Sequence, residues 1–530
     1  MDTVPVSHDV RRASVCITLF FVLGTYYGLS TDIVPLHILM VAGLSWIFAL
    51  LAVFYSSIKA GSVGASWVTT VCIFFCIYCT AFLSASLSSL NQKRCSGYAC
   101  SLYDGHRIEM TGIIDADADV LPSMKPHQTV IQSYLLIEKS ESEGDLLVLD
   151  NQRIRIILYG RDKLNIPLYG ERWKISGRIF VDKRKGSFSD GRNVCVKASA
   201  FDARFISDSN GWWLARRCYA ARRAASALLT VGISDYPNTT DILQSLVLGY
   251  RRLSYEMRQL FVFTGTLHIF AISGSHVVVF GGIIVVVLGM FRISSIYWGF
   301  FLGPLLCAYT FASGMQSSAV RACIMALIYW SAPIVRRRAD ALTALCISAL
   351  LILSIAPTQL QETGFILSFV CVLGLIVLFP LINSPVQALL IPDPLRLQAE
   401  SKTITFGRSV AGIIWSTVSM SLAAWLASVP LIAYYFGNFT PIGMLSNLIV
   451  IPLSFFVLLT GCLSLVLGAC VTSLAVVFNH ANLFLIGIMM WAMDLMARIP
   501  YGSVKVESVP MWGITLWYFL LGLFVFARRK

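Results

Sequence analysis

The chain carries repeated runs of about 20 apolar residues, and these runs constrain its fold more than any other feature. An α-helix needs roughly 20 such residues to cross about 30 Å of hydrocarbon. Apolar residues make up 57% of the 530 residues and charged residues only 13%. In soluble domains about one half of the residues are apolar and about one quarter are charged. We therefore predict a polytopic α-helical membrane protein, and the composition excludes a soluble or disordered chain.

The apolar runs fall into three groups, which predict about twelve transmembrane helices. We interpret the first run as an uncleaved anchor, because further runs follow it without a clear small-residue cleavage site. The stretch 258–274 is apolar but interrupted by glycine and polar residues, which favours a partial or re-entrant helix there. The predicted crossings cover residues 14–29, 34–55, 66–90, 275–291, 295–312, 318–335, 339–356, 364–383, 405–432, 442–467, 470–497 and 511–527.

Basic residues recur between the runs at intervals that orient the chain in a bilayer. If twelve helices cross, these basic segments fall on one side, which the positive-inside rule assigns to the cytoplasm. Both termini are then cytoplasmic, and the segment between the first two groups is external. The formal net charge of +13 suits contact with anionic headgroups or with phosphate-bearing substrates. The basic segments are residues 11–12, 59, 336–338, 396–402 and 528–530.

Residues 93–207 have a different character, with short alternating stretches such as RIRIILYG and RWKISGRIFV between Gly, Asp and Asn turns. This pattern predicts a compact all-β domain. Residues 212–229 then begin with two tryptophans and carry arginines near helical spacing, which is typical of a helix in the membrane interface. We predict four parts: N-terminal transmembrane helices in 1–92, the β domain in 93–207, an interfacial linker helix in 208–240 and a second transmembrane domain in 241–530.

The 14 cysteines lie mostly inside apolar runs, where a thiol behaves as a small hydrophobe, so we predict no metal site. Cys95 and Cys100 stand at the entrance of the β domain, and Cys195 stands near its exit. In an external compartment one disulfide among these three can persist. An unpaired set of thiols is an equal alternative, because sequence does not supply the geometry.

Polar side chains inside apolar runs are the candidate functional residues, because such groups cost several kcal/mol in a bilayer unless they face protein or water. For the histidines, the alternative to function is packing with hydrogen bonds to neighbouring carbonyls. An isolated arginine can instead snorkel to the interface, and an asparagine can form an interhelical hydrogen bond. The candidate transport-pathway residues are Gly265, His268, Ser273, Gly274, Ser275, His276, Arg321 and Asn447.

The linker helix supplies the candidate phosphate contacts, because a guanidinium has forked donors that match phosphate oxygens. Membrane lipid and a phosphate-bearing substrate are both suitable ligands for it. The four candidates are Arg216, Arg217, Arg222 and Arg223.

The stretch TGTLHIFAISGSHV at 264–277 combines Gly, His and an Ala-Ile-Ser-Gly-x-His sequence. It is similar to the signature of the ComEC family of bacterial competence proteins, and it is the most specific of several motifs that resemble that family. The resemblance covers residues 240–465 strongly and reaches the β domain mainly through YGERWKISGRI at 169–179. The supporting motifs follow in the family's order, namely LVLGYRRLS, SSAVRACIM, GFILSF, SVPLIAYYFGNFTP and SNLIVIPL.

The resemblance implies a bacterial inner-membrane channel that imports single-stranded DNA during natural transformation, with a competence-type channel domain and an external OB-like β domain. It implies no enzymatic activity and no cofactor. Many members continue into a metallo-β-lactamase-like domain, but the chain has seven histidines and no HxHxDH cluster. It also has no GxxxxGK[ST] motif for ATP. We therefore expect a DNA-binding receptor, a nuclease and a cytoplasmic ATPase to be separate partners.

Two other functions remain open on the residues alone. A small-solute permease could use a broken helix around Asn447, but it would gain little from a basic β domain. An intramembrane serine hydrolase could use Ser273 and His276, which lie three residues apart, although residues so placed are rarely aligned for proton abstraction.

Overall fold

The computed structural model describes thirteen stretches of the chain, and their residues group into two compact units. The first unit holds Met1–Ala221 and Ile284–Ile366, and the second holds Arg222–Ile283 and Leu367–Lys530. The described residues are 8–30, 63–92, 105–121, 128–142, 153–160, 165–181, 194–208, 210–270, 274–294, 297–334, 336–390, 402–506 and 509–529.

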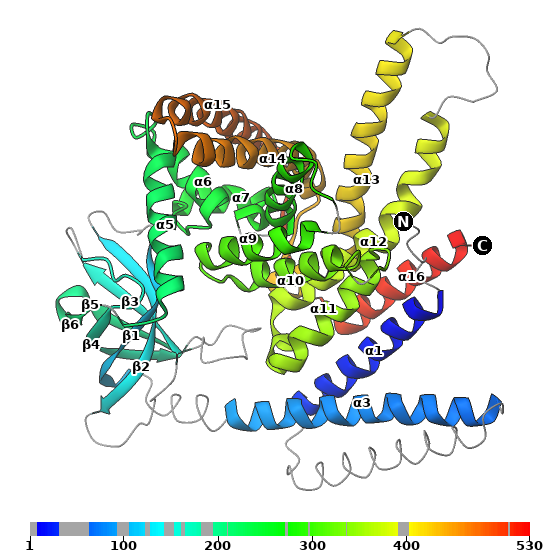
Figure 1. Cartoon of the computed structure of the whole chain (residues 1–530), viewed down its shortest axis with the longest axis horizontal. Helices are drawn as coiled ribbons and strands as arrows, with labels where there is room; N and C mark the ends of the chain where they lie inside the picture. The colour runs from blue at the N-terminus through cyan, green and yellow to red at the C-terminus, as the bar shows by residue number, and fades with distance from the viewer. Residues whose placement is uncertain are drawn as a thin grey trace. The chain divides into compact units, whose positions relative to one another are not determined.

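Six strands of the first unit form the β domain, which confirms the predicted β region (Figure 1). The sheet order is β1-β2-β3-β5-β4-β6, and β1 also pairs with β4, so the first five strands close into a barrel. Only β3 and β5 run parallel, and β6 extends the sheet beyond β4. The strands are β1 (Arg107–Leu121), β2 (Thr129–Ser142), β3 (Arg153–Gly160), β4 (Arg172–Val181), β5 (Val194–Ser199) and β6 (Ala203–Ser207).

The barrel interior follows from the alternation of apolar residues along each strand. Successive side chains of a strand point to opposite faces, so every second residue enters the core. Among the outward residues of the same strands, Lys174 on β4 pairs with Glu109 on β1 at 2.9 Å. The fully buried side chains include Ile108, Met110, Ile114, Leu135, Ile154, Ile156, Ile175 and Ile179.

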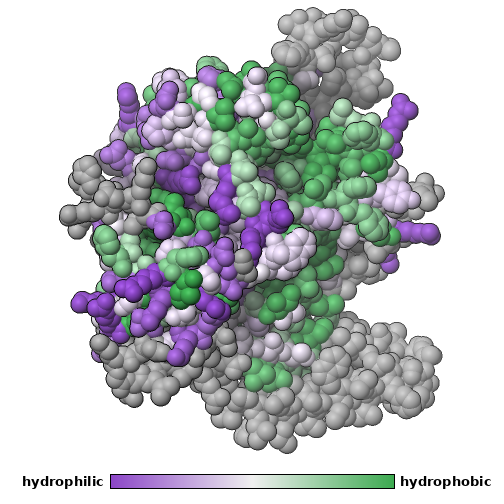
Figure 2. Space-filling view, turned by 60° about the vertical axis from the view of Figure 1, so that its left-hand side comes forward, coloured by the Kyte–Doolittle hydropathy of each residue, from purple (hydrophilic) through white to green (hydrophobic). Residues whose placement is uncertain are grey.

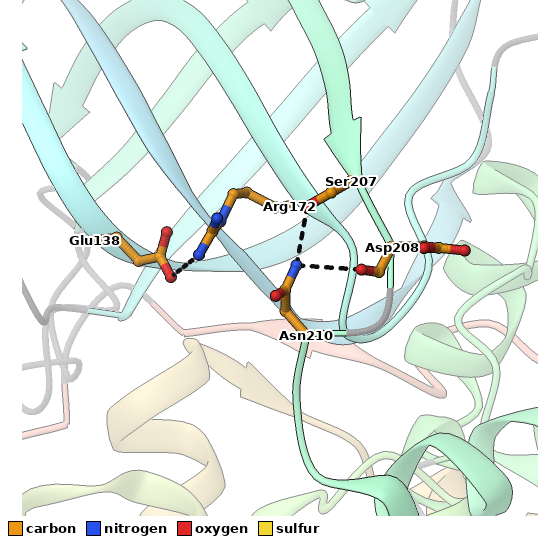
Figure 3. A network of polar contacts seen from close by, with 5 residues as sticks. All are labelled: Glu138, Arg172, Ser207, Asp208 and Asn210. Carbon is orange, nitrogen blue, oxygen red and sulfur yellow. Dashed lines mark hydrogen bonds and ion pairs between the residues drawn. The ribbon is translucent and has the colours of Figure 1, made fainter.

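The YGERW stretch fixes the entry to β4 next to the exit from β6. Gly170 has a φ of +85° and a Cβ there would overlap the carbonyl oxygen of Asn210, so only glycine fits. The Asn210 amide donates to the Ser207 hydroxyl at 3.1 Å and to the Asp208 carbonyl at 3.4 Å (Figure 3). On β4, Arg172 pairs with Glu138 of β2 at 2.8 Å. These contacts fix the segment that leads from the barrel into the next helix.

The other part of the first unit is helical. Helix α1 (His8–Ser30) packs along α3 (Val63–Gln92). The two backbones approach closely because Gly24 and Gly28 have no Cβ, and a Cβ at either position would overlap a backbone oxygen of α3. Helix α1 also contacts α11. The remaining helices are α9 (Trp298–Ala312), α10 (Ser317–Ser331), α11 (Ala341–Ile355) and the 3₁₀ turn η5 (Pro357–Gln361).

The second unit packs short and long helices around one apolar core. Leu243, Leu246, Val450 and Met489 are among its buried residues. Its elements are α6 (Pro237–Leu248), α7 (Tyr255–Phe263), η3 (Leu267–Phe270), α13 (Lys402–Phe436), α14 (Ile442–Gly468), α15 (Thr472–Ala497), the short pair β7 (Asn438–Phe439) and β8 (Val504–Lys505), and α16 (Met511–Arg529). Helices α5 (Trp213–Thr230) and α12 (Thr363–Leu390) each begin in the first unit and continue into the second, and α8 (Gly274–Met290) begins in the second unit and continues into the first.

Helices α14 and α15 form a hairpin that also holds the end of α5. Asn479 is fully buried, and its amide donates to the carbonyls of Leu228 and Val231 at 3.0 and 2.9 Å. Its Oδ1 accepts a hydrogen bond from Ser464 at 2.7 Å. One side chain therefore bonds two carbonyls at the end of α5, where no further helical turn follows.

Five helices in the described part of the chain are long and apolar enough to cross a membrane, which supports a membrane protein. They are Thr363–Gln387, Gly407–Phe436, Ile442–Gly468, Thr472–Ala497 and Met511–Arg528. The predicted runs 14–29 and 66–90 lie in α1 and α3. The runs in α9, α10 and α11 coincide with helices of 15 residues, which are short for a crossing, and the run at 34–55 lies outside the described residues. The count of about twelve crossings, the orientation and the four domain boundaries therefore stay predictions.

Large apolar side chains cover much of the helical surface. Val278, Ile413 and Phe484 are 72%, 68% and 69% exposed. Hydrophobic and hydrophilic residues occupy separate areas of the surface in Figure 2. Exposed apolar area of this extent is typical of a surface that faces lipid.

Candidate functional site

The predicted signature begins with a buried turn between α7 and η3. Ser254 caps the start of α7 by accepting from the Met257 amide. After the helix ends, Thr264 and Thr266 are fully buried and share a hydrogen bond of 2.9 Å between their hydroxyls. His268 is exposed, and its Nδ1 lies 3.1 Å from the Gly265 carbonyl oxygen. The turn therefore brings two of the predicted residues, Gly265 and His268, into contact.

Gly265 is required both by its backbone conformation and by its neighbours. Its φ is +71°, and a Cβ there would lie 3.1 Å from Thr440 Oγ1 and 3.2 Å from Gly443 Cα. Trp425 of α13 donates to the Thr440 carbonyl at 3.3 Å, which fixes the segment that faces the turn. The signature turn thus packs directly on the start of α14.

Replacement of Gly265 by Val is expected to lower the free energy of unfolding by about 3 kcal/mol, because a β-branched residue at positive φ is strained and the added methyls overpack the contact. Gly274 offers a control, since no atom of the described residues lies within 4 Å of a Cβ placed there. Chemical denaturation of the purified protein in detergent measures both variants. Equal stability of Gly265→Val and Gly274→Ala would contradict this account.

His276 is the buried member of the predicted pair of histidines. It lies in the first turn of α8, is 2% exposed and hydrogen-bonds the backbone of Leu246 in α6. Gly274 is exposed with open space beside it. Ser273 lies outside the described residues, and so does the side chain of Ser275. The structure thus ties the second half of the signature to α6.

Buried polar atoms without partners mark the interior of the same unit. Ser245 of α6 and Ser446 of α14 are fully buried, and neither hydroxyl has a hydrogen-bond partner among the described residues. The Oδ1 of Asn447 is likewise buried without a partner in that part of the chain. Each such group costs about 1–3 kcal/mol in an apolar interior, and water can satisfy it. We call Ser245, His276, Ser446 and Asn447 the buried polar set, and we interpret their surroundings as hydratable.

Arg321 belongs to the first unit, so the structure does not join it to the buried polar set. It lies in α10, is 3% exposed, and donates from Nη2 to the Gly364 carbonyl at 2.9 Å. A snorkelling arginine would expose its guanidinium, whereas this one is buried. The contact also joins two motifs of the sequence, SSAVRACIM and GFILSF.

The four arginines of the linker helix differ in burial. Arg217 is exposed, and Arg216 and Arg223 are half-buried. Arg222 is 4% exposed and stacks on Tyr250, which also contacts Arg252. Helical spacing alone did not separate Arg222 from the others.

The structure describes only one of the three cysteines that were considered for a disulfide. Cys195 is a buried free thiol, and Cys95 and Cys100 lie outside the described residues, so a disulfide among them stays a prediction. Within the described stretches, no group of three or more His, Cys, Asp and Glu side chains could hold a metal ion.

The outer face of the barrel carries a row of cations across three strands. Arg107 of β1 pairs in register with Arg178 of β4, and Arg178 pairs with Lys197 of β5. Arg107 contacts Asp202 at 3.6 Å, and Lys197 lies 4.3 Å from the centroid of the Phe180 ring. Elsewhere on the barrel, burial raises the pKa of the Asp115 carboxyl although Arg153 lies 2.7 Å away and lowers it. The row offers an anion several donors on a rigid sheet.

Sequence reasoning missed Ser245, Ser446, Tyr250 and Arg252. The two serines carried no signal, because small hydroxyl residues are common in packed transmembrane helices. Tyr250 and Arg252 stand in the run LVLGYRRLS, whose adjacent aromatic and basic residues could have indicated a cation–π contact.

Comparison with known proteins agrees with the motif analysis. The family model described as "Competence protein" matches residues 246–530. The chain is also similar to ComE operon protein 3 of Bacillus subtilis (strain 168), with 30% identity over 249 residues. That alignment covers 46% of this chain and 28% of the relative, so the chain spans well under half of the relative's length. No solved structure matches the chain.

Proposed function

Because the chain belongs to the competence protein family, we propose that it is an inner-membrane channel that imports single-stranded DNA during natural transformation. The observation that carries the proposal is the buried polar set, in which the Ser245 and Ser446 hydroxyls and the Asn447 Oδ1 have no hydrogen-bond partner among the described residues of a unit made of apolar helices. Transfer of a polyanion through hydrocarbon is prohibitive unless polar groups and water replace its hydration. A hydratable interior is what such a channel needs.

In this proposal the β barrel collects DNA outside the membrane. Its closed five-strand order with one parallel pair is compatible with an OB-like barrel, a fold that binds single strands. The cationic row of Arg107, Arg178 and Lys197 would contact phosphates, and Phe201, which is 89% exposed, could stack on a base. Binding of this kind is tolerant of sequence and weakens with salt.

From the barrel the strand would pass the linker arginines and enter the transmembrane helices. Arg217 is the linker arginine best placed to meet an incoming phosphate, because it is exposed. Arg321 and the predicted residues between Gly265 and His276 would line the passage with Asn447. Both termini would be cytoplasmic and the barrel external. A DNA-binding receptor, a nuclease and an ATPase would be separate proteins, and the channel itself would not be an enzyme.

Two alternatives make different demands on the same residues. A small-solute permease would transport without the barrel, so removal of the cationic row would leave it active. An intramembrane hydrolase would need the Ser273 hydroxyl within hydrogen-bond reach of His276, and Ser273 lies outside the described residues. A serine-directed probe that labels the protein would favour the hydrolase.

The proposal is tested by photo-crosslinking in cells that take up labelled DNA. A photoreactive phenylalanine analogue replaces Asn447 in one variant and Ile413, which is 68% exposed on α13, in another. We expect DNA crosslinks at position 447 and none at position 413. Uptake without crosslinks at 447, or with equal crosslinks at both, would reject a passage beside the buried polar set.

A further inference from the structure

Two arginines from different elements stack on one buried tyrosine in the second unit. The Cζ of Arg222 in α5 lies 3.9 Å from the ring centroid of Tyr250, and the Cζ of Arg252 lies 4.4 Å from the same centroid. Both Tyr250 and Arg222 are 4% exposed, and Arg252 is half-buried. Because an aromatic face attracts cations, Tyr250 holds two guanidiniums near each other.

Protein groups use only part of the donor capacity of these guanidiniums. Arg222 donates from Nε to the Leu248 carbonyl at 3.2 Å, and Arg252 donates from Nη1 to Gln244 Oε1 at 2.6 Å. The Nε of Arg252 is buried and has no hydrogen-bond partner in the described part of the chain. Since a guanidinium has five N–H donors, the hydrogen bonds to described residues leave most of the ten for another group.

The positive charge is also without a close counter-ion. No carboxylate of the described residues lies within 4.0 Å of either guanidinium. Asp241 acts on Arg252 from a greater distance, and burial raises the pKa of its carboxyl more than the Arg252 charge lowers it. Buried charges that lack a partner are costly, so an anion at this position would stabilise the fold.

We propose that Arg222, Tyr250 and Arg252 form a binding site for the phosphate of an anionic phospholipid headgroup. Forked guanidinium donors match phosphate oxygens, and Arg252, which is half-buried, gives the headgroup access. Lipid suits the position because Trp213, the first residue of α5, and Trp212 just before it are 69% and 49% exposed, as expected of side chains at headgroup level. The site would bind lipid whether or not the protein transports DNA.

The site is tested on the purified, delipidated full chain in detergent by native mass spectrometry with added phosphatidylglycerol. Arg252→Gln removes one guanidinium, and Arg251→Gln is a matched control, because Arg251 is the exposed neighbour. We expect about tenfold weaker phosphatidylglycerol binding for Arg252→Gln and unchanged binding for Arg251→Gln. Tyr250→Phe keeps the ring and should retain binding, whereas Tyr250→Leu should lose it.

Three results would overturn the lipid site. They are equal binding by Arg252→Gln and Arg251→Gln, phosphatidylcholine binding as tight as that of phosphatidylglycerol, and displacement of the lipid by a thymidine oligonucleotide, which would make it a DNA site. Failure of the crosslinking test at position 447 would reject the channel and leave these measurements unaffected.

Discussion

Cells of a naturally transformable host that lack this gene are expected to lose transformation down to the background of the assay. In the proposed function this chain supplies the passage for the strand. Without it the strand has no route across the membrane, because its phosphates cannot enter hydrocarbon. Transformation frequency with selectable chromosomal DNA measures the effect, and expression of the wild-type gene from another locus should restore it.

Transformation by plasmid electroporation is the matched control for this deletion, because it bypasses the uptake system. The deletion strain should accept electroporated DNA at the wild-type frequency. A loss in both assays would indicate a general defect of the envelope, and normal natural transformation would reject the proposed function.

Arg321→Ala is expected to give the second-largest effect, a loss of transformation of at least about tenfold. The guanidinium is 3% exposed and donates to the Gly364 carbonyl, so truncation removes a buried charge and leaves that carbonyl without this partner. Charged hydrogen bonds of this kind are worth about 1.5–3 kcal/mol. Transformation frequency is measured together with the amount of protein in the membrane.

Two variants separate a transport role of Arg321 from a structural one. Arg321→Lys keeps the charge and should retain part of the activity at a normal membrane level. Arg337→Ala removes an exposed arginine of the same region and should be neutral. If Arg321→Ala reached normal membrane levels and transformed normally, Arg321 would have no part in the passage.

The β domain shows what sequence pattern can and cannot supply. Alternation along 153–160 and 172–181 predicted strands, and both segments are strands in the barrel. The parallel pairing of Arg155 with Cys195 could not be predicted, because it depends on contacts between segments distant in sequence. The apolar runs predicted helices because helix formation also follows local sequence pattern. The number of helices that cross a membrane depends on their length and their surroundings as well.

The site shows the same limit at the level of single side chains. The signature at 264–277 contains Gly265, which lies in a turn at positive φ, and His276, which is buried, and their predicted place in a transport pathway stays a prediction. Arg222 was grouped with its exposed neighbours, because helical spacing does not reveal that Tyr250 lies beside it. A local pattern thus identifies a polar residue in an apolar run, and only tertiary contacts show what it faces.

The location of labelled DNA in cells tests the central claim, a passage for one strand across the inner membrane, most directly. Labelled DNA is counted separately in the periplasm and the cytoplasm of the deletion strain and of the same strain carrying the wild-type gene. The account predicts that in the deletion strain label reaches the periplasm and is absent from the cytoplasm. Wild-type amounts of cytoplasmic label in that strain would contradict it.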